Sequence, residues 1–208
     1  MKTFLLQGDS ITDAGRNREN DAYRGSGYPT LIAAELMYDH PGEFNVINRG
    51  IGGNRVVDLY ARIKKDFLNL KPDYLSILIG VNDVWHDYSS EPNGVPDERF
   101  RKVYDMLIEE LKAELPELKI YILEPFVLRA SATEEHWEEF DRETRVRAKS
   151  AKWIAEKHGL PFISLQDKFD AACEKCPPSY WLGDGVHPTA AGHELIARAL
   201  MEAVKKDI

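Results

Sequence analysis

The sequence predicts an α/β fold: a three-layer α/β/α arrangement with a parallel sheet of five strands between helices. Two observations predict it. Short, nearly continuous apolar runs are bounded by turn residues, as is typical of strands buried on both faces. Longer segments with apolar residues at helical spacing separate these runs. Strands that alternate with helices in this way form parallel sheets that helices cover on both sides.

Five strands are predicted in order along the chain. Their sequences are KTFLLQ, FNVIN, DYLSILIG, LKIYILE and PFISL, at residues 2–7, 44–48, 73–80, 118–124 and 161–165. Crossovers between parallel strands are right-handed, so the carboxyl ends of all five strands meet at one edge of the sheet. In open α/β sheets this edge is where functional sites form.

Five helices are predicted from apolar positions three or four residues apart. They span residues 27–40, 55–69, 97–114, 133–158 and about 188–204. Pro116 closes the third helix, because proline cannot continue one, and Pro188 stands where helices often begin. The segments between strands and helices at 85–96, 125–132 and 176–187 are expected to gather at the edge of the sheet that carries the site.

Composition limits the class of protein. A length of 208 residues suits a single domain, 1–208, and such a domain needs neither disulfide nor metal to stay folded. The net charge of −8 argues against nucleic acid and anionic membranes as partners. No segment approaches the roughly 20 apolar residues of a membrane span. The first apolar run ends at Leu6, which is short for a secretory signal, so a cytoplasmic location is expected. The composition is compatible with either a monomer or a homo-oligomer.

Two cysteines, Cys173 and Cys176, form the sequence CEKC. A zinc site needs about two further ligands at matching spacing, and the chain has no second pair of cysteines. We therefore interpret the two residues as ordinary thiols in a short helix or loop and expect no metal.

Four short polar blocks stand at strand exits or helix entrances, and the first two follow the first two strands. Gly8-Asp9-Ser10 places a serine at the sheet edge, although a helix N-cap would use the same residues. The second block, 48–54, carries three glycines in four residues. Such a loop brings backbone amides close to a developing negative charge, but it is also consistent with a flexible loop or a phosphate-binding loop. It lacks the lysine of a P-loop and the third glycine of a dinucleotide site.

The other two blocks follow the third strand and precede the last helix. Asn82, in GVND, offers a fixed side-chain N–H donor of the kind that oxyanion holes use, or else forms a turn. Asp184 stands three residues before His187, so its carboxylate is able to fold back onto the imidazole and set its tautomer. Pro188 restricts the backbone of His187 to extended conformations. A polar loop with a surface histidine is the alternative.

Taken together and in this order, the blocks resemble the SGNH hydrolase family, also called GDSL-type esterases. The resemblance runs from residue 4 to about residue 200, with GDSI in place of GDSL. It implies a flavodoxin-like fold, the catalytic residues Ser10, Asp184 and His187, and an oxyanion hole formed by Ser10, Gly53 and Asn82. Gly53 is favoured over Gly52 from its spacing to Asn48. The implied chemistry is hydrolysis of a small-molecule ester without a cofactor.

A narrower resemblance, to the intracellular acetyl-xylan esterases of this family, lies in the flanking sequences GSGYPTLIAAEL, NRGIGGNRVVDLYARIKKD, KPDYLSILIGVNDVWHDY and DGVHPTAAGHELIARAL. It implies a short acyl group, acetyl above all, on a carbohydrate such as a xylo-oligosaccharide. The candidate substrate-binding residues are Asp9, Trp85, Tyr180 and Trp181. Two alternatives remain: a general arylesterase, lysophospholipase or thioesterase, and a catalytically silent carbohydrate-binding protein of the same fold.

Overall fold

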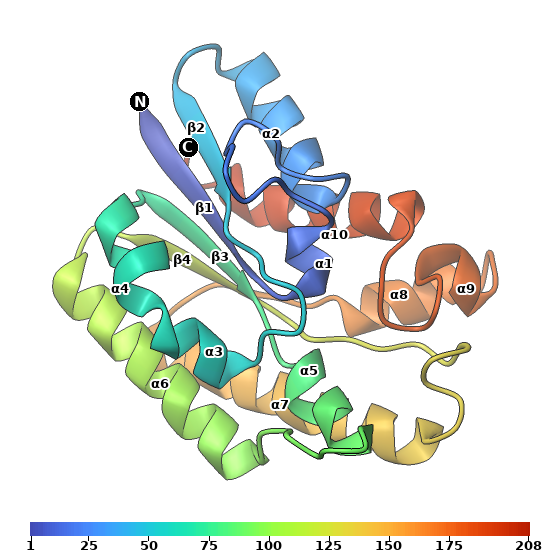
Figure 1. Cartoon of the computed structure of the whole chain (residues 1–208). Helices are drawn as coiled ribbons and strands as arrows, with labels where there is room; N and C mark the ends of the chain where they lie inside the picture. The colour runs from blue at the N-terminus through green and yellow to red at the C-terminus, as the bar shows by residue number, and fades with distance from the viewer.

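A five-stranded, all-parallel sheet forms the centre of the molecule in the computed structural model, which describes residues 1–208 (Figure 1). Its order is β2-β1-β3-β4-β5. Phe4 of β1 is paired with Val46 of β2 on one side and with Tyr74 of β3 on the other. The strands are β1 (Lys2–Gly8), β2 (Phe44–Asn48), β3 (Tyr74–Leu78), β4 (Lys119–Leu123) and β5 (Phe162–Ile163).

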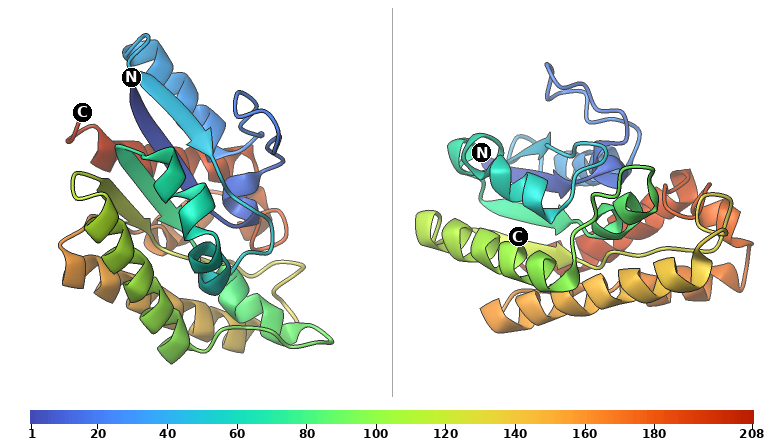
Figure 2. Two further views of the ribbon diagram at one scale, coloured as in Figure 1. Left: turned by 60° about the vertical axis from the view of Figure 1, so that its left-hand side comes forward. Right: turned by 60° about the horizontal axis from the view of Figure 1, so that its bottom comes forward.

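Helices cover both faces of the sheet, and the views in Figure 2 show the three layers. One face carries α2 (Tyr28–Asp39), α8 (Gln166–Cys173) and α10 (Ala190–Val204), and the other carries α3 (Val56–Ala61), α4 (Ile63–Asp66), α6 (Asp97–Glu114) and α7 (Trp137–His158). Alternate side chains of β1 pack against the helices on opposite faces of the sheet. Phe4 and Leu6 belong to the core beneath α2 and α10, whereas Leu5 belongs to the core beneath α3 and α6. The predicted three-layer fold is confirmed.

Local sequence signals explain where the long helices begin and end. α6 follows Pro96 and has Asp97 and Glu98 in its first turn, where negative charge stabilises the helix dipole. α7 ends at Gly159, which adopts a left-handed conformation with φ 65°. Thr189 caps α10, because its side chain accepts a hydrogen bond from the amide of Gly192.

The prediction of one helix over 55–69 was wrong. That segment is divided into α3, α4 and the 3₁₀ helix η1 (Leu68–Leu70). The division falls at Arg62, which has φ −111° and ψ 15° and whose side chain turns to Asn54 and Asp66. Short elements without a readable periodicity also went unpredicted: α1 (Ser10–Asp13), α5 (Val81–Trp85), η2 (His86–Tyr88), α8 and α9 (Pro178–Trp181).

The strand order creates a topological switch point between β1 and β3. The chain leaves β1 for β2 on one side, then crosses back to β3 on the other. Crevices at the carboxyl ends of strands form at such points, because the connections diverge to opposite faces. Ser10 follows β1 and Asn82 follows β3 at this point. None of the helices combines the length and the apolar character that crossing a membrane requires.

Candidate active site

Ser10 stands at the first turn after β1. Gly8 allows the tight exit, since a Cβ at this position would collide with the carbonyl oxygen of Leu78 and the hydroxyl of Thr12. Asp9 is fully buried and caps α1, because its Oδ1 accepts a hydrogen bond from the amide of Ile11 at 2.9 Å. Ser10 is the first residue of α1, so its own amide has no partner within the helix.

Ser10, His187 and Asp184 form one chain of hydrogen bonds. Ser10 Oγ lies 2.9 Å from His187 Nε2, and His187 Nδ1 lies 2.7 Å from Asp184 Oδ2. The serine and the histidine are 177 residues apart in the sequence. A histidine placed in this way is able to take a proton from the serine through one ring nitrogen while the carboxylate holds the other. The three residues predicted to be catalytic are therefore brought together.

Backbone amides hold the carboxylate of Asp184 in its position next to His187. Its Oδ1 accepts hydrogen bonds from the amides of Val186 at 2.9 Å and His187 at 2.8 Å. Partial burial raises the pKa of Asp184, but the hydrogen bonds from His187 and Val186 outweigh burial and hold this pKa below its ordinary value. Asp184 is thus an anion at neutral pH.

The glycine loop after β2 passes directly over α1. The amide of Gly52 donates to Asp13 Oδ2 at 3.1 Å. Gly53 has φ 80°, a conformation that favours glycine, and its amide makes no hydrogen bond within the protein. A Cβ on Gly52 would lie 3.7 Å from the Cβ of Ser10, so this loop is in contact with the serine.

Asn82 is buried at the start of α5 and faces the same space. Its side-chain amide donates to the carbonyl of Asn54 at 3.2 Å. An amide group carries two N–H donors, so the second is left for a ligand. The next residue, Asp83, accepts from the amide of Val56 at 3.1 Å and binds the exit of the glycine loop to α5. The first turn of α5 therefore holds the loop in place.

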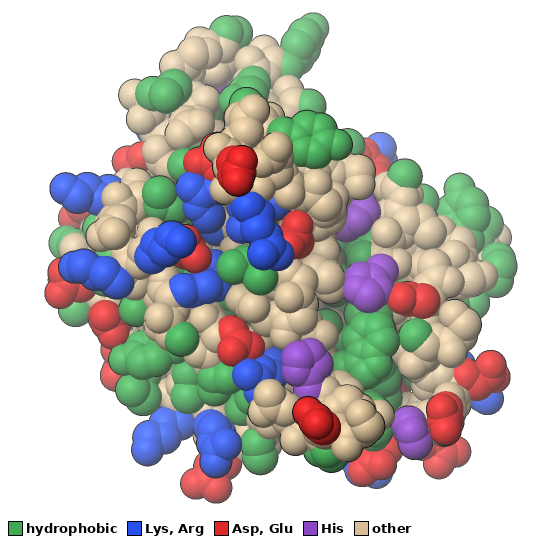
Figure 3. All heavy atoms as spheres, viewed as in Figure 1, with side chains coloured by type: hydrophobic (Ala, Val, Ile, Leu, Met, Phe, Trp, Pro, Cys, Tyr) green, Lys and Arg blue, Asp and Glu red, His purple; other side chains and the backbone are tan.

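A cavity of about 380 Å³ opens above Ser10. Its lining residues are Ser10, Gly53, Asn82, Trp85, His86, Tyr88, Ser89 and His187. The centroid of the Trp85 ring lies 5.7 Å from that of His187 and 6.0 Å from that of Phe140, so the indole is wedged between the imidazole and α7. Figure 3 shows histidine side chains beside an apolar patch around a hollow near the centre of this face.

Of the four candidate substrate-binding residues, only Trp85 lines this cavity. Asp9 lies beneath Ser10 with no exposed surface, because capping α1 turns its carboxyl inward. Tyr180 and Trp181 lie in α9, and Trp181 lines a separate groove between α8 and α10. Asp9, Tyr180 and Trp181, predicted to bind substrate, therefore lie outside the cavity above Ser10. Sequence reasoning also missed Ser89 as a lining residue and Asp13 as the partner of the glycine loop.

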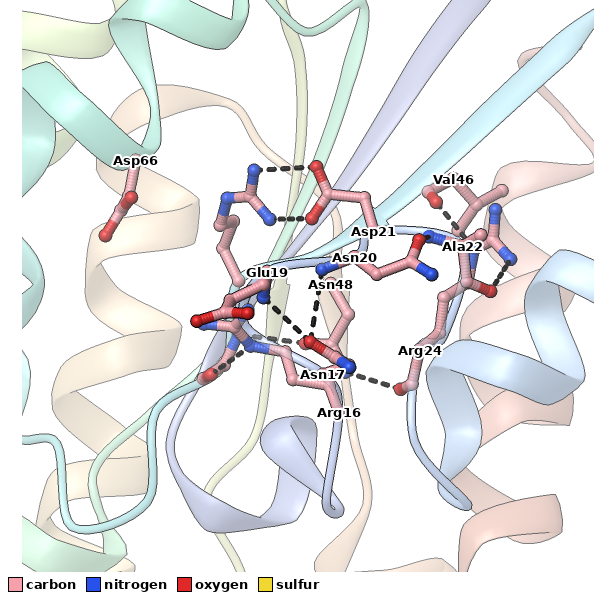
Figure 4. Close-up of polar contacts among 12 residues, drawn as sticks. Arg16, Asn17, Glu19, Asn20, Asp21, Ala22, Arg24, Val46, Asn48 and Asp66 are labelled. Atoms are coloured by element: carbon pink, nitrogen blue, oxygen red, sulfur yellow. Dashed lines mark hydrogen bonds and ion pairs between the residues drawn. The ribbon is translucent and has the colours of Figure 1, made fainter.

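The loop 16–24 packs against the far side of the glycine loop (Figure 4). Arg16 Nε donates to the carbonyl of Gly50 at 2.7 Å, and Arg49 forms an ion pair with Asp21. The side-chain amide of Asn48 donates to the carbonyls of Thr12 at 2.6 Å and Arg24 at 2.9 Å. These contacts tie the loops after β1 and β2 together.

Comparison with known proteins agrees with this site. Residues 6–195 match the GDSL-like Lipase/Acylhydrolase family. An acetylxylan esterase from Geobacillus stearothermophilus is 33% identical over 215 residues, covering 97% of this chain and 93% of that protein.

Solved structures agree as well. A GDSL-like lipase from Parabacteroides merdae superimposes with a TM-score of 0.91 at 38% identity, over 97% of this chain and 94% of that one. Axe2, the acetylxylan esterase from Geobacillus stearothermophilus, superimposes with a TM-score of 0.86 at 31% identity, over 97% and 93%. Its solved forms include catalytic mutants in which a serine or an aspartate is replaced by alanine.

The match spans nearly the whole chain and includes all four polar blocks. It confirms the resemblance to GDSL-type esterases and the class of enzyme. The chain belongs to the GDSL-like lipase/acylhydrolase family and is a carboxylic ester hydrolase.

Proposed function

We propose that this protein is a serine esterase that removes acetyl groups from carbohydrate, with acetylated xylo-oligosaccharides as substrates. One observation supports it above all: a hydrogen-bonded Ser10–His187–Asp184 chain opens onto a small cavity beside Gly53 and Asn82. The likeness to acetylxylan esterases over nearly the full chain supports the choice of substrate.

In the proposed acylation step, Ser10 Oγ attacks the ester carbonyl while His187 Nε2 accepts its proton. Asp184 stabilises the imidazolium that forms. His187 then protonates the departing sugar oxygen, and the acetyl group stays on Ser10. In deacylation His187 activates a water molecule, which attacks the acetyl ester and releases acetate.

Three N–H donors hold the oxyanion in this mechanism. They are the backbone amides of Ser10 and Gly53 and the side-chain amide of Asn82. The hydrogen bond from Gly52 to Asp13 supports Gly53 as the donor, because it directs the amide of Gly52 away from the cavity. Donors fixed before the reaction stabilise the charge that develops in the transition state without reorganising.

The walls of the cavity support a short acyl group and a polar alcohol. Of the eight lining residues, only Trp85 and Tyr88 are hydrophobic. A long acyl chain would gain about 0.8 kcal/mol for each methylene group that it buries in an apolar pocket, and this cavity offers little such surface. Aromatic rings beside polar groups suit a sugar ring.

A hydrolysis screen tests the proposal. The specificity constant is measured for acetyl, butyryl and octanoyl p-nitrophenyl esters, together with acetate release from acetylated xylo-oligosaccharides. We expect a constant that falls with chain length and rapid release from the oligosaccharides. A constant that rises with chain length, without release from sugars, would favour a general esterase or lysophospholipase. Sugar binding with no hydrolysis of any ester would favour a silent binding protein.

A further inference from the structure

The cavity above Ser10 contains one polar side chain that neither the proposed mechanism nor the fold employs. Ser89 Oγ donates to backbone carbonyls, those of His86 at 3.0 Å and Glu91 at 2.7 Å. The ring of Tyr88 stacks on His136 with centroids 4.7 Å apart. The same ring also packs against Phe140 of α7, with centroids 5.5 Å apart. The imidazole of His86 is therefore the polar side chain of this cavity that has no role in the fold or in the proposed mechanism.

The position of His86 relative to the reacting atoms is well defined. Its Nε2 lies 4.0 Å from the point that a Cβ on Gly53 would occupy. Its backbone carbonyl is held by the amide of Asn93 at 3.1 Å and by Ser89 Oγ. Neither ring nitrogen has a hydrogen-bond partner in the protein. The ring therefore lies beside the proposed oxyanion donor with both nitrogens available to a ligand.

The imidazole of His86 is mostly neutral at pH 7. Partial burial lowers its pKa, and the positive charge of Arg55 lowers it further. A neutral imidazole offers one N–H donor and one acceptor. A hydroxyl group has the same two capacities, whereas a carboxylate or an ammonium group would be better matched by a charged side chain.

We propose, on the basis of the proposed function, that His86 selects esters of polyols that keep a free hydroxyl group beside the acetylated one. The imidazole binds this neighbouring hydroxyl while Trp85 lines the adjacent wall. The enzyme then prefers partly acetylated sugars, and its specificity constant falls when every hydroxyl is acetylated. His86 is a specificity-determining residue and takes no part in proton transfer.

Two pairs of substrates test this proposal. One pair is a mono-O-acetyl methyl xyloside and its fully acetylated form, and the other is glycerol monoacetate and glycerol triacetate. Specificity constants are corrected for the number of ester groups. One hydrogen bond contributes about 1 kcal/mol, so we expect the wild type to prefer the partly acetylated member of each pair by roughly five-fold.

The variant His86→Phe keeps an aromatic ring but removes both nitrogens, and it should lose this preference. His86→Gln, which retains a donor and an acceptor, should keep part of it. His40→Phe is the matched control, because His40 ends α2 and lies outside the cavity; its preference should equal that of the wild type.

A preference that survives in His86→Phe, or that is absent from the wild type, would overturn the assignment. So would a changed acyl-chain preference in His86→Phe with unchanged selection of the alcohol, because His86 would then contact the acyl group. Failure of the proposed function has a different signature. In that case the xylosides are not hydrolysed, while the glycerol pair still reports on His86.

Discussion

The amide of Gly52 donates to the carboxylate of Asp13 at 3.1 Å, and this contact joins the last residue of α1 to the loop after β2. Asp13 Oδ1 also accepts from the amide of Arg16 at 3.2 Å. The carboxylate therefore connects two loops that are distant in the sequence. Gly53 follows Gly52 directly. We therefore expect the orientation of the Gly53 amide to depend on Asp13, whose side chain lies outside the cavity.

Replacing Asp13 by alanine tests this dependence. We expect kcat to fall by roughly ten-fold with little change in KM, because a loosened donor stabilises the transition state less and the bound ester hardly at all. Steady-state hydrolysis of p-nitrophenyl acetate gives both constants. Asp39→Ala, at the exposed end of α2, is the control. Equal kcat in Asp13→Ala and the wild type would show that the contact has no bearing on Gly53.

Asn82→Ala removes a proposed oxyanion donor outright. Loss of one such donor typically lowers kcat by about 10²–10³, and we expect KM to change far less, since the negative charge appears mainly in the transition state. Steady-state hydrolysis of p-nitrophenyl acetate measures kcat and KM for this variant. Asn82 also binds the carbonyl of Asn54, so circular dichroism must show an intact fold. A folded variant with wild-type kcat would show that Asn82 only shapes the turn and does not bind the oxyanion.

Asp9 makes the stability of the protein depend on pH. Burial raises its pKa to about 7, although the hydrogen bond from Ile11 and the charge of His187 lower it. Because this value lies above that of an unfolded aspartate, about 3.9, the folded state keeps a proton that the unfolded state has lost. The free energy of unfolding should therefore fall as the pH rises through about 4 to 7.

Asp9→Asn should flatten this dependence, because asparagine stays neutral and still accepts the hydrogen bond from Ile11. Urea unfolding at several pH values between about 5 and 8 measures the slope. Asp83 is buried with its pKa raised in the same direction, to about 8, so part of the slope remains. Asp39→Asn serves as the control for an exposed carboxyl. Identical slopes in Asp9→Asn and the wild type would contradict the assigned pKa.

The sequence was most informative where local patterns repeat or where a residue stands at a strand exit. All five strands were predicted within a few residues, because buried parallel strands are continuous apolar runs. That Ser10, Asn82 and His187 lie together was predictable for a related reason: the end of a parallel strand and the entrance of a helix both lie at the edge of the sheet. Their convergence follows from the topology.

What the sequence did not reveal depends on contacts between distant residues. Asp13 and Gly52 are 39 positions apart, and nothing near either residue indicates the other. The position of Trp181 beside α8 and α10 was not predictable, because the sequence shows that an aromatic residue flanks Asp184 but not which way α9 turns. The inward orientation of Asp9 likewise depends on its capping of a helix too short to show periodicity.

The central claim is that Ser10 carries the acyl group during turnover. Rapid acid quench of the enzyme with excess acetylated xylo-oligosaccharide, followed by mass spectrometry of the peptide that contains Ser10, tests it most directly. We predict an acetyl group on Ser10 in the wild type, and neither the modification nor acetate release in folded Ser10→Ala. Acetate release by Ser10→Ala at the wild-type rate, or an acetyl group on a different residue, would contradict the claim.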